Sequence, residues 1–129
     1  MSGAFEVGAS IPLRAFHRLP WAEGPEGEPH PHQYRIEVVV ERSRLDDRGM
    51  VIDLDLLQRG LEEVTARLEG EDLDERIAPA DAEAVTVEIL ARWLHGELRE
   101  PVRRGGGDVL SVRVWEAPDA FGGYRGEVA

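Results

Sequence analysis

The chain contains no cysteine and no lysine, and few of its side chains are aromatic. The absence of cysteine from its 129 residues excludes disulfides, thiolate nucleophiles and zinc sites built from cysteine. All fifteen basic residues are arginine, and 26 acidic residues outnumber them, which gives a net charge of −11. Because no basic stripe offsets this charge, we expect neither nucleic acid nor an anionic membrane as a partner.

Long apolar runs are also missing. Residues 1–16 have neither a basic start nor a continuous apolar core, so we expect no signal peptide. No segment approaches the length that crosses a membrane. The chain is 42% apolar, which is enough for one hydrophobic core. We therefore predict a single domain over residues 1–129, located in the cytoplasm.

An alternating pattern near the start of the chain predicts a first β-strand. Every second residue is apolar from Phe5 to Ala15. The same parity continues to His17 and Leu19, so we expect the His17 side chain on the buried face. Residues 20–31, with four prolines and three glutamates, predict a loop.

A second strand follows, and two histidines precede its apolar pattern. Residues 35–41 contain alternating apolar positions, and His30 and His32 share the parity of those positions. Residues i and i+2 of a strand point to the same face. The two imidazoles are therefore expected to point the same way.

The middle of the chain predicts two amphipathic helices. Leucines and a valine at steps of three and four predict a helix over residues 54–68, which Asp53 can cap. An acidic loop, residues 69–81, leads to a second helix over about residues 82–98. His95 lies near the end of that helix, where we expect an exposed side chain or one that matches the helix dipole.

Two more strands complete the pattern. Alternating residues predict a third strand over residues 110–116 and a short fourth strand over residues 121–127. The element order is then β-β-α-α-β-β. This order is typical of an α+β fold in which a four-stranded antiparallel sheet carries both helices on one face.

Four polar side chains are expected on inward faces at strand ends: His17, His30, His32 and Glu116. Each would cost a few kcal/mol if it were buried without a partner. Three histidines with an open position form the usual catalytic zinc site, although histidines near strand ends often only form hydrogen bonds. Glu116 is either a surface carboxylate on a fraying strand or an anchor that accepts two parallel N–H bonds from a flat, amide-bearing ring.

Five short motifs occur in order along almost the whole chain. They are FHRL (16–19), HPHQY (30–34), GMVIDL (49–54), TVE (86–88) and VWE (114–116). In this combination the chain resembles the 6-pyruvoyl-tetrahydropterin synthase family, which includes the 6-carboxytetrahydropterin synthases. The resemblance implies the T-fold (tunnelling fold), whose sheets join into an oligomeric barrel. It also implies a trimer-based homo-oligomer, most often a hexamer, with sites between subunits.

The resemblance also implies roles for individual residues. The implied zinc ligands are His17, His30 and His32. The implied anchor of a pterin ring is Glu116, with help from Thr86 and Glu88. By themselves, Thr86 and Glu88 are typical of N-terminal capping and dipole matching in a helix.

The chain departs from the family pattern at several catalytic positions. The family's catalytic cysteine, four residues before the first histidine of its H-G-H motif, is Glu26 here. The family's L-D-H motif aligns with residues 68–70, LEG, so its histidine is replaced by glycine. Val87 replaces the threonine- or serine-type residue that precedes the family glutamate. Pro31 replaces the glycine between the two histidines, where it fixes φ and favours an extended His30.

Three hypotheses about function follow. A positioned general base contributes roughly 10²–10⁴ in rate, so we expect a homologue that binds a pterin-like or purine-like ring without the standard synthase reaction. The alternative is an active pterin-processing lyase, in which Glu26 or Glu28 acts as a base and shortens the side chain of dihydroneopterin triphosphate. Burial can raise the pKa of such a carboxyl group into a useful range. The third is a structural or regulatory oligomer, which has no need for an inward Glu116.

Overall fold

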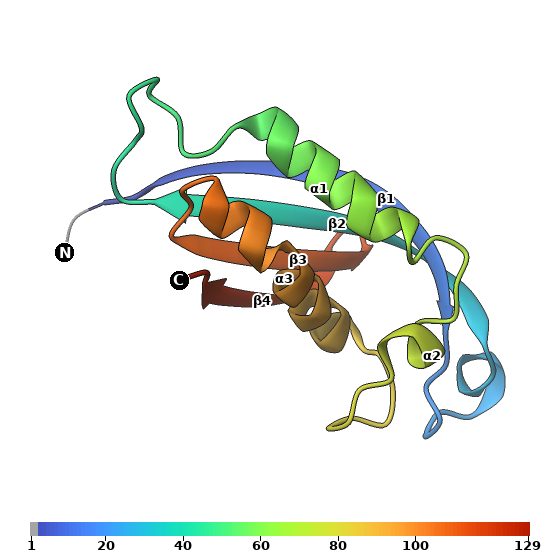
Figure 1. Cartoon of the computed structure of the whole chain (residues 1–129). Helices are drawn as coiled ribbons and strands as arrows, with labels where there is room; N and C mark the ends of the chain where they lie inside the picture. The colour runs from blue at the N-terminus through green and yellow to red at the C-terminus, as the bar shows by residue number, and fades with distance from the viewer. Residues whose placement is uncertain (1–2) are drawn as a thin grey trace.

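The computed structural model describes residues 3–129 and shows an antiparallel sheet whose helices lie on one face (Figure 1). The strands, hydrogen-bonded in this order, are β1 (Phe5–His17), β2 (His30–Arg42), β3 (Val109–Ala117) and β4 (Ala120–Glu127). The helices are α1 (Leu54–Ala66), α2 (Leu73–Ile77) and α3 (Val87–Arg104), and a 3-10 turn, η1, spans Gly24–Gly27. The predicted four-stranded antiparallel sheet is confirmed.

The sheet is built on a long ladder between β1 and β2. Their register runs from Phe5↔Arg42 to His17↔His30, so the two strands pair along their whole length. The ladder between β2 and β3 is shorter and begins only at Arg35↔Trp115. Residues 30–34 of β2 therefore have no partner on the β3 side. This notch in the sheet lies beside the histidines.

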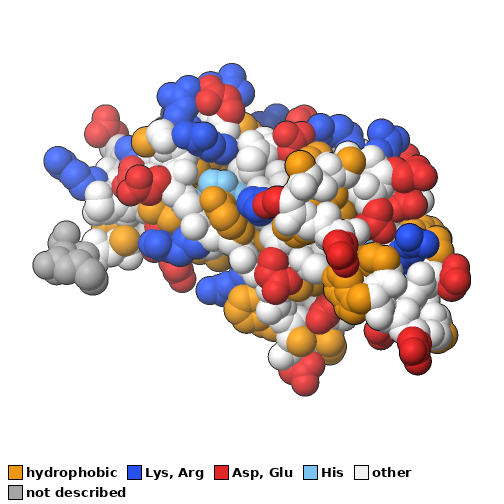
Figure 2. All heavy atoms as spheres, turned by 90° about the horizontal axis from the view of Figure 1, so that it is seen from below, with side chains coloured by type: hydrophobic (Ala, Val, Ile, Leu, Met, Phe, Trp, Pro, Cys, Tyr) orange, Lys and Arg blue, Asp and Glu red, His pale blue; other side chains and the backbone are white. Residues whose placement is uncertain are grey.

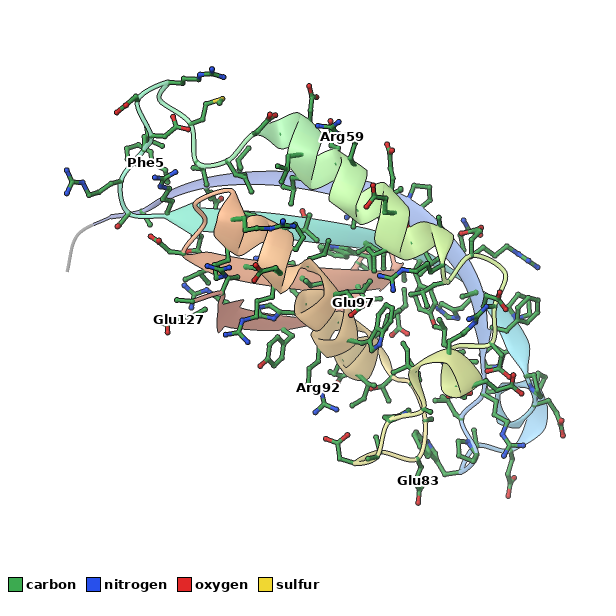
Figure 3. The ribbon with its side chains drawn as sticks, in the orientation of Figure 1. Phe5, Arg59, Glu83, Arg92, Glu97 and Glu127 are labelled. Carbon is green, nitrogen blue, oxygen red and sulfur yellow. The ribbon has the colours of Figure 1, made fainter. Side chains whose placement is uncertain are left out.

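The core lies between the sheet and the two long helices. Alternate strand residues face it, and those of the central region are completely buried: Leu13, Ala15, Ile36, Val38, Val40, Leu110, Val112 and Val114. Arg59 on α1 and Arg92 on α3 point away from the sheet (Figure 3). Acidic and arginine side chains are mixed over the face seen in Figure 2. Among residues 3–129, no helix is both long and apolar enough to cross a membrane.

The long helices begin at side-chain caps. The Asp53 carboxylate accepts a hydrogen bond from the Asp55 N–H at 3.0 Å, which confirms the predicted cap of α1. Thr86 caps α3 by accepting from the Ile89 N–H at 3.2 Å, so α3 begins later than the predicted residue 82. The helix also continues beyond the predicted end at residue 98, because its apolar stripe extends to the buried Val102.

The acidic segment 69–81 was predicted as a loop, and this was wrong for α2. Asp72 caps this short helix by accepting from the Asp74 N–H at 2.9 Å. Leu73 is completely buried, and Arg76 lies in the last turn, where a positive charge suits the helix dipole. The cap and one buried leucine hold a helix that is too short to show an apolar period.

His95 is buried, so the expectation of an exposed or merely dipole-matched residue was wrong. Only 6% of it is exposed, and its Nε2 lies 3.1 Å from the Gly126 carbonyl oxygen on β4. The ring also contacts Tyr124, with centroids 4.9 Å apart. A Cβ at position 126 would lie 3.2 Å from His95 Nε2, so the glycine leaves room for the ring between α3 and β4.

Candidate functional site

His17, His30 and His32 meet at the end of the β1–β2 ladder. His17 ends β1, and its register partner His30 begins β2. The ring centroids of His17 and His30 are 4.6 Å apart, and one nitrogen from each of the three rings lies within 4.8 Å of the other two. The predicted convergence of these side chains is confirmed. The triad could hold a metal ion.

Backbone carbonyl groups orient two of the three rings. His17 Nδ1 lies 3.1 Å from the Val85 carbonyl oxygen, and His30 Nδ1 lies 2.9 Å from the Glu28 carbonyl oxygen. A carbonyl oxygen only accepts hydrogen bonds, so each Nδ1 carries the proton and donates it. In the neutral form of either ring, Nε2 then keeps its lone pair, which is how proteins prepare a histidine to bind a metal.

Burial keeps His17 neutral. Only 7% of the residue is exposed, and desolvation lowers the pKa of its imidazole below the ordinary 6.5. The hydrogen bond to Val85 opposes this shift, while the neighbouring His30 and His32 add to it. A neutral imidazole is the form that binds a metal.

The lowered pKa of His17 predicts that the metal-free protein loses stability in mild acid. The folded state has the lower pKa, so the unfolded state binds more protons as the pH falls below 6.5, and the free energy of unfolding decreases there. Above pH 6.5 this contribution is fully present. Urea unfolding at pH 7.5 and 5.5, in the presence of a chelator, measures the difference. His17→Gln should show a smaller loss, and an equal loss in this variant would contradict the prediction.

Pro31 fits between the two histidines without breaking the ladder. The N–H groups of Arg14 and Phe16 point to the outer edge of β1, where they bond to the segment 69–71. Phe16 and its register partner Pro31 are therefore a pair without mutual hydrogen bonds. The Pro31 nitrogen faces the notch, where β2 has no neighbouring strand. The missing N–H thus costs no hydrogen bond in the sheet.

Glu116 lies beside the triad. The sequence predicted an inward side chain, but the side chain is not buried. The register between β3 and β4 shifts between Trp115 and Ala117, so Glu116 occupies a β-bulge, which redirects a side chain. Its side chain is 45% exposed, and its Oε2 lies 3.9 Å from His32 Nε2. The carboxylate can therefore reach both the triad and a ligand in the notch.

Tyr34 forms the floor of the site and was not recognised from the sequence. Its ring lies 4.8 Å from that of His32, centroid to centroid, and only 3% of the residue is exposed. Burial raises the pKa of the Tyr34 hydroxyl, and the charges of Glu116 and Asp74 raise it further. The hydroxyl therefore stays protonated at neutral pH. Its parity with His30 and His32 in HPHQY was the signal that could have identified it.

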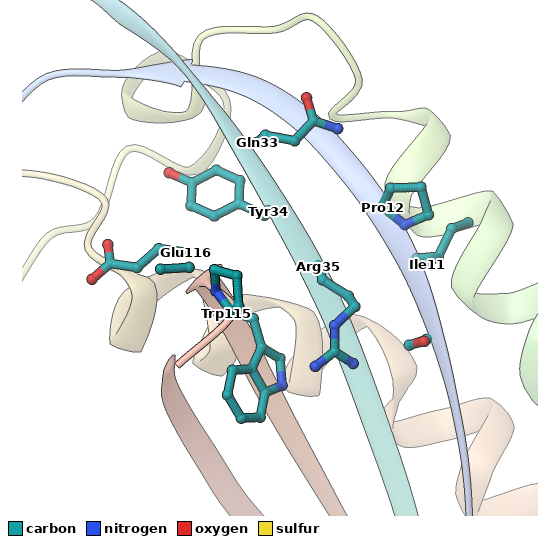
Figure 4. A pocket seen from close by; sticks show the side chains of 10 residues that line it. Ile11, Pro12, Gln33, Tyr34, Arg35, Trp115 and Glu116 are labelled. Atoms are coloured by element: carbon teal, nitrogen blue, oxygen red, sulfur yellow. The ribbon is translucent and has the colours of Figure 1, made fainter. Parts of the chain in front are cut away.

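A cavity of about 520 Å³ lies at the notch. His17, His30 and His32 do not line it, but Tyr34 and Glu116, which both lie beside His32, form part of its wall. Figure 4 shows Glu116 and Tyr34 on one side of it and Ile11 and Pro12 on the other. Arg35, whose guanidinium lies over the Trp115 ring at 4.9 Å from the centroid, forms part of the wall. The cavity is lined by Ser10, Ile11, Pro12, Gln33, Tyr34, Arg35, Trp115, Glu116, Ala117 and Pro118. It combines apolar walls with a few polar groups, as small-molecule sites do.

Thr86 and Glu88 lie at the N-terminus of α3. The Thr86 hydroxyl caps the helix, and Glu88 is an exposed acid in its first turn, as the capping interpretation predicts. The carbonyl oxygen of Val85, the residue before Thr86, accepts a hydrogen bond from the His17 ring. This helix end is therefore adjacent to the triad.

The main chain of the loop before β2 also serves the site. The Glu28 carbonyl oxygen orients His30, and the Glu26 carbonyl oxygen accepts from the Leu19 N–H at 2.8 Å. The carboxylates of Glu26 and Glu28 both belong to exposed residues. The loop thus fixes the first residue of β2 and presents two carboxylates near it.

Comparisons with known proteins agree with this fold. The family profile described as 6-pyruvoyl tetrahydropterin synthase matches residues 7–127. A protein of Archaeoglobus fulgidus, provisionally named 6-carboxy-5,6,7,8-tetrahydropterin synthase, is 29% identical over 119 residues. The match covers 92% of this chain and 94% of the relative.

Solved structures of 6-pyruvoyl tetrahydropterin synthases share the fold. The Plasmodium vivax enzyme gives a TM-score of 0.74 at 13% identity, covering 98% of this chain and 99% of its own. The Caenorhabditis elegans enzyme gives 0.71 at 19% identity and covers 98% of both chains. A further Plasmodium vivax structure, with a TM-score of 0.73, 14% identity and coverage of 98% and 99%, carries a substitution of a glutamate described as a catalytic residue. These structures confirm the predicted T-fold, and the family profile shows that this chain belongs to the 6-pyruvoyl tetrahydropterin synthase family.

Proposed function

We propose that this protein binds a pterin-like or purine-like ring in the cavity beside the triad and that it does not perform the standard synthase reaction. The position of Glu116 carries the proposal, because its carboxylate lies both at the triad and in the cavity wall. One carboxylate can accept two parallel N–H bonds from the amide edge of such a ring, and charge-assisted bonds of this kind are the strong ones.

The triad suits zinc, which is the metal that we propose for it. Three imidazole nitrogens within 4.8 Å of one another match the donor set of a catalytic zinc site. The hydrogen bonds from His17 and His30 to backbone carbonyls supply the outer contacts that such ligands usually have. Zinc, when bound, acts as a Lewis acid that polarises an oxygen of the ligand.

Two features support the absence of the standard reaction. Gly70, which aligns with the family histidine, has no side chain, and its N–H is bonded to the Arg14 carbonyl oxygen at 2.7 Å. Its neighbour Glu69 accepts from the Arg14 N–H, so this carboxylate is engaged with the edge of β1. Glu26, which aligns with the family cysteine, provides a carboxylate where the family has a thiolate.

A second candidate function is a pterin-processing lyase with a glutamate base. The related Plasmodium vivax enzyme has a catalytic glutamate, and in this chain Glu26 and Glu28 lie in the loop that orients His30. In this case Glu26 or Glu28 would remove the proton of a side-chain hydroxyl of dihydroneopterin triphosphate. The adjacent C–C bond would break, the outer fragment would leave as an aldehyde, and the electron pair would stay on the carbon attached to the ring, which would be protonated and would keep a shorter side chain.

We also propose that the protein is a trimer-based homo-oligomer, namely a hexamer, in which the sheets of neighbouring subunits join into a barrel. Within residues 3–129, the outer edges of β1 and β4 have no neighbouring strand, and open edges favour pairing with another chain. The segment 69–71 covers the outer edge of β1 at Arg14 and Phe16, and Pro12 has no N–H to offer there. Pairing at β1 is therefore expected along residues 5–11.

Chromatography after incubation with dihydroneopterin triphosphate and zinc tests the reaction. We expect no significant amount of the pyruvoyl or carboxy product, because the thiolate and the imidazole are both replaced, and each positioned acid or base contributes roughly 10²–10⁴ in rate. Formation of either standard product at rates typical of the family would contradict this expectation. A shortened pterin that is lost in Glu26→Gln or Glu28→Gln, but not in the loop variant Glu23→Gln, would establish the lyase instead.

A further inference from the structure

Asp74, in the first turn of α2, connects two backbone segments that determine the position of His17. Its Oδ2 accepts a hydrogen bond from the N–H of Arg18, the residue after His17, at 3.0 Å. Its Oδ1 accepts from the Val85 N–H at 2.9 Å. The carbonyl group of the same Val85 then accepts from His17 Nδ1 at 3.1 Å. One carboxylate thus holds both the chain that carries the ring and the residue that orients it.

The carboxylate itself is firmly placed. The N–H of Asp74 is bonded to the cap residue Asp72, and the next residue towards the N-terminus, Leu73, is completely buried. The segment before α2 is joined to the end of β1 by the bond from the Phe16 N–H to the Glu71 carbonyl oxygen, at 2.8 Å. Asp74 therefore joins the end of β1 to the loop that contains Val85 through two hydrogen bonds.

We propose that Asp74 is a positioning residue for the metal ligand His17, acting through the main chain of Val85. Outer contacts of a metal-binding histidine usually come from a carboxylate or a carbonyl group that touches the ring directly. Here the carboxylate holds the peptide that provides the carbonyl group. Without Asp74, the Val85 carbonyl group is no longer tied to the end of β1, and the His17 ring loses its fixed tautomer and orientation. The inference rests on the proposed zinc site.

Three variants separate this role from a general contribution to folding. Asp74→Ala removes both acceptors, whereas Asp74→Asn keeps one acceptor oxygen for two N–H groups. Glu75→Gln is the matched control, because it removes a charge from the same turn of α2 at an exposed residue. Circular dichroism and thermal melting establish which variants are folded.

The first measurement is the tautomer of His17 in the metal-free protein, from long-range ¹H–¹⁵N NMR spectra. We expect the Nδ1–H tautomer in the wild type and in Glu75→Gln, and a mixture of tautomers in Asp74→Ala. The second measurement is the zinc dissociation constant, obtained by competition with a chelator. We expect it to increase about 10- to 100-fold in Asp74→Ala, as for other outer contacts of metal ligands, to increase less in Asp74→Asn, and to stay unchanged in Glu75→Gln.

The outcomes distinguish the two proposals. A folded Asp74→Ala with an unchanged tautomer and zinc affinity overturns the role of Asp74, and if this variant does not fold, Asp74→Asn decides in the same way. A wild type that binds no zinc overturns the proposed metal site only. The tautomer in the metal-free protein then still decides whether Asp74 positions His17.

Discussion

Glu116→Ala should weaken the binding of a reduced pterin by about ten- to a hundred-fold. The expected loss follows from ring N–H groups that would be left without an acceptor, at a cost of about 1–3 kcal/mol and more if the carboxylate is desolvated by the ligand. Glu116 lies in a bulge at the end of β3, away from the buried core, so the fold should be retained. Isothermal titration calorimetry with a pterin gives the dissociation constant directly.

Two further variants sharpen the test of Glu116. Glu116→Gln keeps one acceptor oxygen but loses the charge, so its loss of affinity should lie between those of the wild type and Glu116→Ala. Asp119→Ala removes an exposed carboxylate from the turn between β3 and β4 and should leave the affinity unchanged. If the wild type binds no pterin, or if Glu116→Ala binds as well as the wild type, the proposed pocket is wrong.

His30→Ala should abolish metal binding. The wild type, purified without a chelator, should contain about one zinc ion per chain, since three histidine ligands are the usual number in catalytic sites. The substitution leaves only two, and it also removes the ring that Glu28 orients. Metal analysis by mass spectrometry should therefore find almost no zinc in the variant.

His95 provides the matched control for the metal. It is the one histidine outside the triad, and it packs against β4, so His95→Gln should retain zinc whenever the variant is folded. In the wild type, zinc at 100 times its dissociation constant should stabilise the fold by about 2.7 kcal/mol, and His30→Ala should show no such gain. A wild type that is metal-free and is not stabilised by added zinc contradicts the proposed zinc site.

The triad could be predicted because its geometry depends on local strand parity. His17 continues the alternation of β1, and His30 and His32 share the parity of β2, so one ladder brings the three rings together. The same parity predicts that Glu116 lies on the side of the triad, but it did not predict that the side chain, which lies in a bulge, is 45% exposed. No pattern of apolar residues in β3 or β4 indicates where such a bulge occurs.

The outer contacts of His17 could not be predicted, because they join distant parts of the chain. The helix α2 has five residues, which are too few to show a repeating apolar pattern. The sequence therefore predicted an acidic loop at Asp74. The burial of His95 depends on a glycine of β4 that makes room for the ring. Both features are set by tertiary packing rather than by local propensity.

The strands β1 and β2 are close in the sequence, whereas β2 and β3 are far apart, and this difference affects the order of folding. The three histidines of the triad belong to two strands joined by a short loop, and closing a short loop costs little entropy. The ladder between β2 and β3 must close over the segment that contains all three helices, and such distant contacts form slowly. The Val85 carbonyl group that orients His17 is 68 residues away. During synthesis the three imidazoles should therefore come together before the contact that fixes the tautomer of His17, so that a metal ion can meet a flexible His17 first and a preorganised one later.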